Sequence, residues 1–275
     1  MRVFAPAKVN LALHVTGRRD DGYHLLDSLV VFADIGDWLE ITLADTLSLT
    51  ITGPRAGGVP DDARNLVWQA ADLIGPGRGA RITLDKHLPH AGGIGGGSAD
   101  AAAALRALAQ MWDVPLPSGD TLLALGADMP VCLHARPCRM GGIGEILDTV
   151  PHLPPLWLVL VNAGVAVPTG PVFKALATVD NRPLYPMTWS DVPSFTHWLC
   201  GARNDLEAPA RVLAPEIGVV LDHLNAQPGC AVARMSGSGG TCFGLFTAED
   251  AAKDAAVELR AANPDWWVQD GAILP

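Results

Sequence analysis

A glycine-rich segment after Leu88 contains the residues best suited to bind a phosphate group. It holds Gly92, Gly93, Gly95, Gly96 and Gly97, followed by Ser98 and an alanine-rich stretch. Glycines adopt backbone angles that a Cβ forbids, and they let the backbone approach a ligand closely. A helix beginning at Ser98 would be capped by the serine and would point unpaired N–H groups and the positive end of its dipole at the loop. We expect a phosphate site here, and the alternative is a flexible surface loop.

The spacing of these glycines excludes two common phosphate loops. Gly92 and Gly97 are spaced as in a P-loop, but Ser98 stands where that loop requires a lysine. Counting from Gly93 or Gly95 places Ser98 or Asp100 at the last glycine position of a Rossmann loop. If the segment binds an anion, it therefore belongs to another class of anion site.

Lys8 and Asp128 are the side chains best placed to handle charge during a phosphoryl transfer. The residues from Lys8 to Val15 alternate as in a strand, which puts Lys8 and Asn10 on one face. Asp128 stands among apolar neighbours, where partial desolvation beside an ammonium group would suit a general base. The ordinary alternatives are a solvated surface lysine and a turn aspartate that hydrogen-bonds its own backbone.

Three further features could hold a second ligand. Tyr23 and His24 follow the polar turn 19–22 and could offer a π face and a hydrogen-bonding ring to a heterocyclic base. Phe173 and the glycine cluster 236–240 are less specific. An exposed Tyr-His pair, a helix core phenylalanine and a hairpin turn would explain the same residues.

The elements that must position these residues follow from periodicity and turn residues. In the first half of the chain the pattern predicts strands at 8–15, 25–33, 38–43, 47–52 and 80–86, and helices at 61–74 and 98–112. Turns at Gly22, Gly36-Asp37 and Asp45 separate the early strands. The sequence Gly75-Pro76-Gly77 ends the first helix.

A proline-rich interruption at 151–155 predicts a boundary between an N-terminal domain, 1–152, and a C-terminal domain, 153–275. The second half reads as a strand at 156–162, helical segments between 168 and 226, strands at 230–235 and 241–246, a helix at 249–262 and a strand at 266–269. Without the extra helices the order is β-α-β-β-α-β, a ferredoxin-like unit. The predicted fold class is α+β, with a strand-rich first domain that also carries helices.

Composition excludes several kinds of partner. The chain has 19 basic and 29 acidic residues, a net charge of −10 and a pI of about 5.1. It therefore lacks the positive excess that nucleic acid or anionic lipid requires. The first residues resemble no signal or transit peptide, and the longest strongly apolar run, Leu156 to Val161, is too short to cross a bilayer. We expect a cytoplasmic protein without nucleic-acid or membrane partners, as a monomer or homodimer.

The cysteines and histidines predict neither disulfides nor a metal site. The 5 cysteines are odd in number and form no Cys-x-x-Cys pair, which favours buried free thiols. The 8 histidines show no His-x-x-x-His or His-Glu-x-x-His spacing. No protein-built transition-metal site is expected.

Several motifs occur together and in one order. Pro6-Ala-Lys-Val-Asn-Leu11, the segment 88–98 and Met235-Ser-Gly-Ser-Gly-Gly240 resemble the three motifs of the GHMP kinases, a superfamily of small-molecule kinases. Gly22-Tyr-His24 and Leu125-Gly-Ala-Asp-Met-Pro-Val131 resemble the branch that phosphorylates a cytidine-diphosphate methylerythritol on the route to isoprenoids. The similarity runs nearly the whole length of the chain.

The resemblance implies a role for each matching residue. The catalytic pair falls on Lys8 and Asp128. The nucleotide side falls on an adenosine-side asparagine and on the glycine loop: Asn65, Pro89, His90, Ala91, Gly92, Gly93, Ile94, Gly95, Gly96, Gly97, Ser98 and Ala99. On the acceptor side, Tyr23 and Phe173 would sandwich the base, His24 would hydrogen-bond it and Asn10 would lie near the erythritol. The other implied acceptor residues are Thr169, Gly237 and Gly239.

The implied reaction transfers the γ-phosphoryl group of ATP to the 2-hydroxyl of the methylerythritol moiety, with Mg²⁺ carried on the nucleotide. Asp128 would take the proton and Lys8 would steady the developing charge. Ala99 departs from the pattern, because many GHMP kinases carry a second serine there that could contact phosphate or Mg²⁺.

Two alternatives to this reaction stay open. One is another GHMP kinase, acting on mevalonate or homoserine, and the Tyr23-His24 pair with Phe173 argues against it. The other is a catalytically silent GHMP-like protein that binds ligand and acts through a partner. The presence of both Lys8 and Asp128 argues against that second alternative.

Overall fold

Two long strands, β1 (Arg2–Arg18) and β2 (His24–Leu43), pair with each other and contribute residues to two units of the structure. The computed structural model describes residues 1–275. Unit 1 consists of residues 1–8, 36–90 and 95–135, and unit 2 of residues 9–35, 91–94 and 136–275. The units are built from several stretches and do not coincide with the halves 1–152 and 153–275. The status of those halves as domains stays a prediction.

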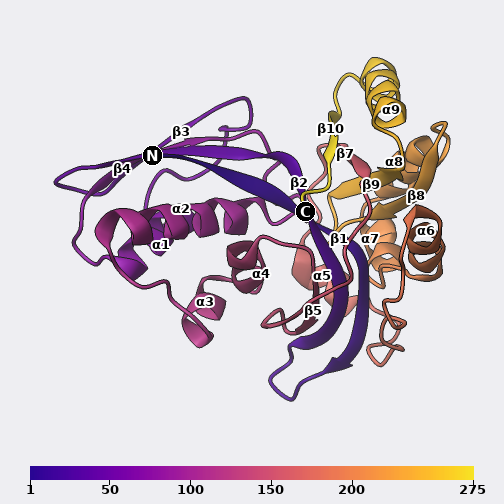
Figure 1. The fold of residues 1–275 in the computed structure, drawn as a ribbon, viewed down its shortest axis with the longest axis horizontal. Coiled ribbons are helices and arrows are strands. Elements are labelled where there is room, and N and C mark those ends of the chain that lie inside the picture. The colour runs from indigo at the N-terminus through magenta and orange to yellow at the C-terminus, as the bar shows by residue number, and fades with distance from the viewer. The chain divides into compact units, whose positions relative to one another are not determined.

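Unit 1 combines a small sheet with helices. The last part of β2 pairs antiparallel with β4 (Ala80–Asp85), and β4 pairs in parallel with β3 (Ser48–Thr52). Parallel strands need a crossover, which α1 (Leu66–Ile74) supplies. Helix α1 packs against α2 (Gly96–Trp112), and both helices lie on one side of these strands (Figure 1).

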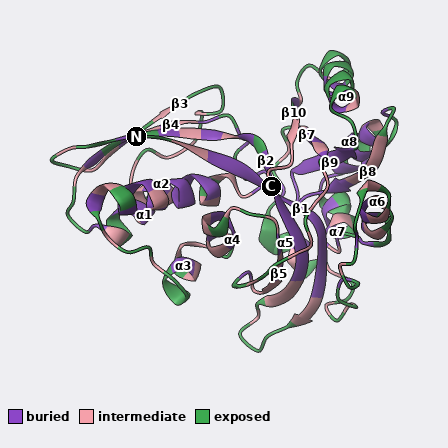
Figure 2. Cartoon of the chain, viewed as in Figure 1, coloured by how far each residue is buried: buried purple, intermediate pink, exposed green.

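Helix α2 is buried along most of its length (Figure 2), and alanine is its most frequent residue type, whose small side chain lets neighbouring elements approach closely. It begins at Gly96. Gly95 takes the N-cap position with a left-handed φ of 63°. The prediction that Ser98 caps this helix is wrong, since Ser98 lies inside the first turn and the N-cap position is taken by Gly95, whose positive φ a glycine adopts without strain.

The predicted turn at Gly36-Asp37 between strands 25–33 and 38–43 is also wrong, because both stretches belong to one continuous strand, β2. A Cβ at Gly36 would lie 2.2 Å from the carbonyl oxygen of Ala5. Gly36 therefore allows strand β1 to approach closely, which is a common role of glycine inside a strand.

The predicted helix at 61–74 begins later than expected. Helix α1 starts at Leu66 after Asn65, whose side chain caps it. Two short helices, α3 (Asp120–Leu125) and α4 (Met129–His134), follow α2 in unit 1, and neither was predicted from the sequence.

Unit 2 contains the first part of β2, which pairs antiparallel with β5 (Cys138–Gly142), and β5 in turn pairs with β6 (Ile146–Asp148). It also contains an antiparallel sheet of order β10-β7-β9-β8. The strands of that sheet are β7 (Trp157–Asn162), β8 (Cys230–Met235), β9 (Thr241–Phe246) and β10 (Trp267–Ala272).

Helices connect these strands in the predicted order. Between β7 and β8 lie α5 (Thr169–Lys174), α6 (Val192–Gly201), α7 (Glu207–Leu213) and α8 (Glu216–Asn225), and α9 (Glu249–Ala262) joins β9 to β10. The order β-α-β-β-α-β and the antiparallel sheet confirm the ferredoxin-like unit and the α+β class. None of the helices combines the length and the apolar character needed to cross a bilayer.

The core of unit 2 forms where amphipathic helices meet this sheet. Helix α9 buries Ala252, Ala255, Ala256 and Leu259, whose spacing defines one helical face. A buried cation ties β8 to other parts of the unit: the guanidinium of Arg234 donates to the carbonyl oxygens of Leu11 (2.6 Å), Leu199 (3.1 Å) and Ala202 (2.8 Å). The part of β1 from Val9 onward is therefore tied into this unit.

Candidate active site

Lys8 and Asp128 form an ion pair in unit 1, with 3.0 Å between Nζ and Oδ2. The Lys8 side chain is 4% exposed and the Asp128 side chain 33% exposed. The ammonium group is thus enclosed, while the carboxylate stays open to a ligand. The structure brings together the two residues that the sequence assigned to catalysis, and a carboxylate so placed can accept a proton from a hydroxyl group.

The position of Asp128 depends on helix α4, which follows it directly. The backbone carbonyl of Asp128 accepts the N–H of Cys132 at 3.0 Å. At the other end of the helix, Arg106 of α2 donates to the carbonyl oxygens of Cys132 (3.0 Å) and Leu133 (3.3 Å). A cation is favourable at the C-terminal end of a helix. Arg106 therefore fixes α4 on α2, and with it the backbone of Asp128.

The start of α2 lies directly against Lys8. A Cβ at Gly95 would be 3.1 Å from Lys8 Cε and 3.5 Å from Cys132 Sγ. Burial raises the pKa of the Cys132 thiol, so this sulfur is a neutral filler. The first N–H groups of a helix lack partners within the helix and attract anions. Lys8 adds a positive charge beside them.

The middle of the glycine loop, residues 91–94, belongs to unit 2 and packs against the second glycine cluster. Ser236 Oγ donates to the carbonyl oxygen of Gly93 at 3.2 Å and accepts the N–H of Asn10 at 3.1 Å. A Cβ at Gly93 would lie 2.4 Å from the carbonyl oxygen of Gly239, and a Cβ at Gly237 would lie 2.6 Å from that of Gly93. The cluster does join β8 to β9, but its glycines also permit this backbone contact.

His24 and Phe173 stack in unit 2, with ring centroids 4.8 Å apart and an interplanar angle of 29°. Burial, followed by the charge of Arg18, lowers the pKa of His24, so its ring is neutral near pH 7. Tyr23 is 58% exposed. The structure pairs two of the three predicted base-binding rings, and the sandwich between Tyr23 and Phe173 stays a prediction.

The remaining predicted acceptor residues lie in polar contacts of unit 2. Asn10 is fully buried, and its Nδ2 donates to Ser28 Oγ at 2.8 Å. Thr169 is the first residue of α5, and its hydroxyl is 2.8 Å from that of Ser238 in the second glycine cluster. Their roles toward a ligand stay predictions.

Asn65, predicted on the adenosine side, uses its amide within unit 1. Its Oδ1 accepts the N–H of Val67 at 2.8 Å, and its Nδ2 donates to the carbonyl of Pro60 at 2.7 Å. These bonds start helix α1. The structure therefore gives Asn65 a capping role, and contact with a nucleotide stays a prediction.

A buried cluster in unit 1 was not predicted from the sequence. Lys86 Nζ donates to Asp37 Oδ2 at 2.5 Å and to Asp100 Oδ2 at 2.6 Å, and all three side chains are almost fully enclosed. Burial raises the pKa of Asp100 to about 8, against the lowering effect of Lys86. The signal in the sequence was weak, because Asp37 follows a glycine and resembles a turn residue, and Asp100 stands in an alanine-rich helix.

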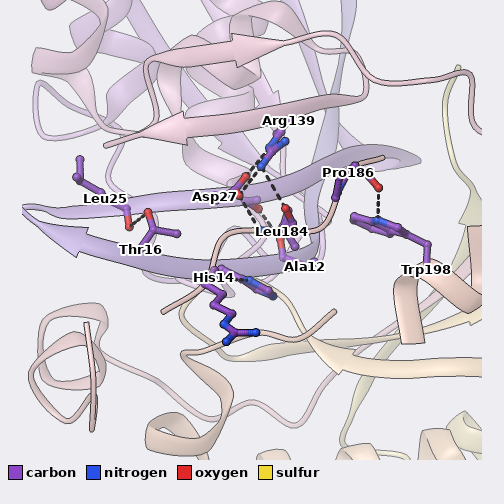
Figure 3. A network of polar contacts seen from close by, with 11 residues as sticks. Ala12, His14, Thr16, Leu25, Asp27, Arg139, Leu184, Pro186 and Trp198 are labelled. Carbon is purple, nitrogen blue, oxygen red and sulfur yellow. Dashed lines mark hydrogen bonds and ion pairs between the residues drawn. The ribbon is translucent and has the colours of Figure 1, made fainter. Parts of the chain in front are cut away.

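A second polar network fastens the segment after α5 to the strands of unit 2 (Figure 3). Arg139 donates to both oxygens of Asp27 at 2.7 Å, and Asp27 also accepts the N–H of Leu184 at 2.7 Å. His14 Nδ1 lies 2.8 Å from the carbonyl of Arg182. This network stabilises unit 2 through bonds to side chains of β1, β2 and β5.

The chain contains no cluster of three or more His, Cys, Asp or Glu side chains that could hold a metal ion. The carboxylates near the glycine loop are instead paired with lysines.

Comparison with known proteins supports the family resemblance inferred from the sequence motifs. The descriptions GHMP kinases N terminal domain and GHMP kinases C terminal match residues 65–144 and 193–265. A 4-diphosphocytidyl-2-C-methyl-D-erythritol kinase from Jannaschia sp. (strain CCS1) is 67% identical, over 99% of this chain and 97% of that relative. The chain belongs to the 4-diphosphocytidyl-2-C-methyl-D-erythritol kinases, within the GHMP kinases.

Solved structures agree with membership of this kinase family. A crystal structure of 4-(cytidine 5'-diphospho)-2C-methyl-D-erythritol kinase has a TM-score of 0.77 and 35% identity, and covers 100% of both chains. A homoserine kinase from Cytophaga hutchinsonii shares the fold, with a TM-score of 0.62 and 18% identity, covering 100% of this chain and 94% of that one. The GHMP kinase fold expected from the sequence is confirmed.

Proposed function

We propose that the protein transfers the γ-phosphoryl group of ATP to the 2-hydroxyl of 4-diphosphocytidyl-2-C-methyl-D-erythritol, giving the 2-phosphate and ADP. The observation that carries the proposal is the Lys8–Asp128 pair beside Gly95 at the start of α2. A helix N-terminus, an ammonium group and an accessible carboxylate supply anion binding, charge stabilisation and a base. The name of the 67% identical relative supports the choice of acceptor.

In this proposal the chemistry depends on positioning, and Asp128 acts on the acceptor. The acceptor oxygen forms a new bond to the γ-phosphorus while the bond from that phosphorus to the leaving oxygen of ADP breaks. The hydroxyl proton moves to the carboxylate of Asp128. Lys8 Nζ, 3.0 Å from that carboxylate, stabilises the negative charge on the transferring group.

ATP is the proposed donor, and Mg²⁺ is proposed to arrive bound to its phosphate oxygens. When bound, the cation would neutralise phosphate charge, and the Ser98 hydroxyl is the chain's proposed oxygen contact to it. Ala99 supplies no second hydroxyl. Backbone N–H groups at the start of α2 would therefore make most of the phosphate contacts.

Recognition of the acceptor is assigned to unit 2. The neutral ring of His24 has one donor and one acceptor nitrogen, which suits the hydrogen-bonding edge of a cytosine. Phe173 offers an aromatic face, and the exposed ring of Tyr23 can turn to cover a base. Asn10, Thr169, Gly237 and Gly239 are proposed to line the rest of the acceptor site. We propose a cytoplasmic location, without nucleic-acid or membrane partners.

The test of the function is an acceptor panel. The protein is incubated with Mg-ATP and, in parallel, with 4-diphosphocytidyl-2-C-methyl-D-erythritol, mevalonate and homoserine, while ADP and product mass are followed. We expect a phosphorylated product from the first acceptor only. A product from mevalonate or homoserine alone would assign another GHMP activity, and no product with bound ATP would indicate a ligand-binding protein.

Tyr23→Ala tests the base sandwich. Because Tyr23 is exposed, its removal should leave folding and the KM for ATP unchanged and raise the acceptor KM about tenfold, the scale of a lost aromatic contact in a binding site. Tyr185→Ala is a matched control, since Tyr185 is also exposed, at 55%, and no acceptor role is proposed for it. An unchanged acceptor KM in Tyr23→Ala would refute the sandwich.

A further inference from the structure

The buried cluster of Lys86, Asp37 and Asp100 contacts the chain both before and after the glycine loop. On the entry side, Asp37 Oδ1 accepts the N–H groups of His87 (2.5 Å) and Leu88 (2.8 Å), the residues that lead into the loop. On the exit side, a Cβ at Gly96 would lie 3.3 Å from Lys86 Nζ. Asp100 is on the same helix, one turn after Gly96.

One ammonium group therefore connects the two ends. Lys86 Nζ bonds Asp37, which holds residues 87–88, and it bonds Asp100, which is part of α2. Asp37 is completely buried and Asp100 is 2% exposed, so solvent cannot replace these bonds. Removing one partner of such a bond destabilises the protein, because the other partner is left buried without a hydrogen bond.

The two carboxyl groups of the cluster have different environments. Asp37 accepts two backbone N–H bonds and one from Lys86, which suits an ionised carboxylate. Asp100 bonds Lys86 through Oδ2 and also shares a hydrogen bond with Asp37, while its Oδ1 is buried without a partner. This geometry fits one proton held by Asp100, so that the cluster is neutral overall.

We propose that Lys86, Asp37 and Asp100 are positioning residues that hold residues 87–88 and the start of α2 in the arrangement that binds the phosphates of the nucleotide. Asp37 acts as the ionised anchor, and Asp100 acts as a neutral partner of Lys86. The inference rests on the proposed function for the identity of the ligand, but not for the arrangement of the clamp.

The test makes the same substitution, aspartate to asparagine, at three buried carboxylates and compares the effects. In Asp37→Asn, one amide NH₂ must face either Lys86 or the N–H groups of residues 87–88, so the anchor is lost. In Asp100→Asn, the amide can accept from Lys86 and donate to Asp37, as the protonated acid does. Asp27→Asn is the control, because Asp27 is a buried partner of Arg139 in unit 2 and its bonds to Arg139 and Leu184 involve none of the three cluster residues.

Two readouts are measured on the full-length protein. Hydrogen exchange of peptides spanning residues 86–99 should be at least about tenfold faster in Asp37→Asn, and within about twofold of wild type in the other two variants. The KM for ATP should rise about tenfold in Asp37→Asn, with the acceptor KM within about twofold of wild type, since a shifted phosphate loop weakens nucleotide binding. Asp37→Glu, which keeps the charge but displaces it, should give an intermediate exchange rate, and it serves if Asp37→Asn does not fold.

The outcomes separate the clamp from the proposed function. Unchanged exchange at 86–99 in Asp37→Asn and Asp37→Glu, or an equal rise of both KM values, would overturn the clamp. Loss of the exchange protection in Asp100→Asn would overturn the neutral role of Asp100. If the wild-type protein phosphorylates no acceptor, the proposed function fails, and the clamp is then judged by calorimetric binding of Mg-ATP together with exchange. Absence of Mg-ATP binding to the wild-type protein would overturn the clamp's nucleotide role as well.

Discussion

Unit 1 contains two lysine–aspartate groups that both lie against the start of α2, yet they differ in how far they are open to solvent. Lys8 contacts the position of Gly95 and pairs with Asp128, which is 33% exposed. Lys86 contacts the position of Gly96 and pairs with Asp37 and Asp100, whose side chains are 0% and 3% exposed. Asp128 is therefore the carboxylate that a ligand can reach, whereas Asp37 and Asp100 are enclosed among groups of the protein. The proposed roles of the two groups rest on this difference in exposure.

Asp128→Asn tests the chemical side of this comparison and should have the largest effect. An amide cannot accept the hydroxyl proton, so turnover should fall about 10²- to 10⁴-fold. The KM for ATP should change little, and the melting temperature should stay within about 2 °C, because Asp128 is partly solvated. Steady-state kinetics and thermal unfolding measure these quantities. Turnover within a few-fold of wild type would show that Asp128 is not the base.

Lys86→Met tests the structural side of the comparison, with Lys8→Met as its matched variant. Removing Lys86 leaves Asp37 buried and without its cation, which should cost about 3–5 kcal/mol in the free energy of unfolding. Removing Lys8 leaves Asp128 partly hydrated and should cost less, about 1–2 kcal/mol, while turnover falls strongly. Urea unfolding followed by circular dichroism gives both values. Equal destabilisation by the two variants would break the distinction.

The pH dependence of stability tests the proton on Asp100. Burial raises its pKa in the folded protein above the ordinary value of 3.8, to about 8. The folded state then holds a proton that the unfolded state releases, so the contribution of Asp100 to stability falls as the pH rises between about 4 and 8. Asp100→Asn has no such titrating group and does not lose this stability. The difference in melting temperature, variant minus wild type, should therefore increase by several degrees between about pH 5 and about pH 8.

The control for the pH experiment is Asp100→Ala. It removes the same titrating group and should show the same trend with pH from a lower starting stability, since it also removes a partner of Lys86. A difference between wild type and Asp100→Asn that stays constant with pH would show that Asp100 is ionised in the fold.

Alanine substitutions at the two glycines should give the smallest effects. Gly95 has a φ of 63°, so Gly95→Ala carries a cost of about 1 kcal/mol and also crowds Lys8 at 3.1 Å. Turnover should fall several-fold. Gly96 is the first helical residue, and Gly96→Ala only requires the end of Lys86 to move by a few tenths of an ångström, so turnover should stay within about twofold. If turnover fell more in Gly96→Ala than in Gly95→Ala, activity would depend more strongly on the position of Lys86 than on that of Lys8.

The sequence alone predicted much of the fold and the charged pair. Alternation from Lys8 to Val15 and the order of elements after Trp157 are local patterns, and the structure contains them. Lys8 and Asp128 could be selected because they belong to recognisable motifs, and the structure places them 3.0 Å apart.

The rest could not be predicted because it depends on contacts between distant parts of the chain. Gly36-Asp37 has the composition of a turn, and only the approach of Ala5 to Gly36 and of Lys86 to Asp37 shows why both residues lie in a strand. Ser98 is a good capping residue, but the positive φ of Gly95 places the helix start earlier. The raised pKa of Asp100 depends on burial and on the neighbouring charges of Lys86 and Asp37, which are distant in the sequence.

The bonds of Arg234 limit how this chain can be divided into fragments. Its guanidinium is held by carbonyl oxygens of Leu11, Leu199 and Ala202, so one partner comes from the first strand and two from the second half of the sequence. A fragment beginning at 153 would keep the arginine and lose the carbonyl of Leu11, leaving a buried cation short of an acceptor. When the protein is expressed as two fragments, β1 must therefore stay in the same fragment as the C-terminal sheet, even though the two are far apart in the sequence.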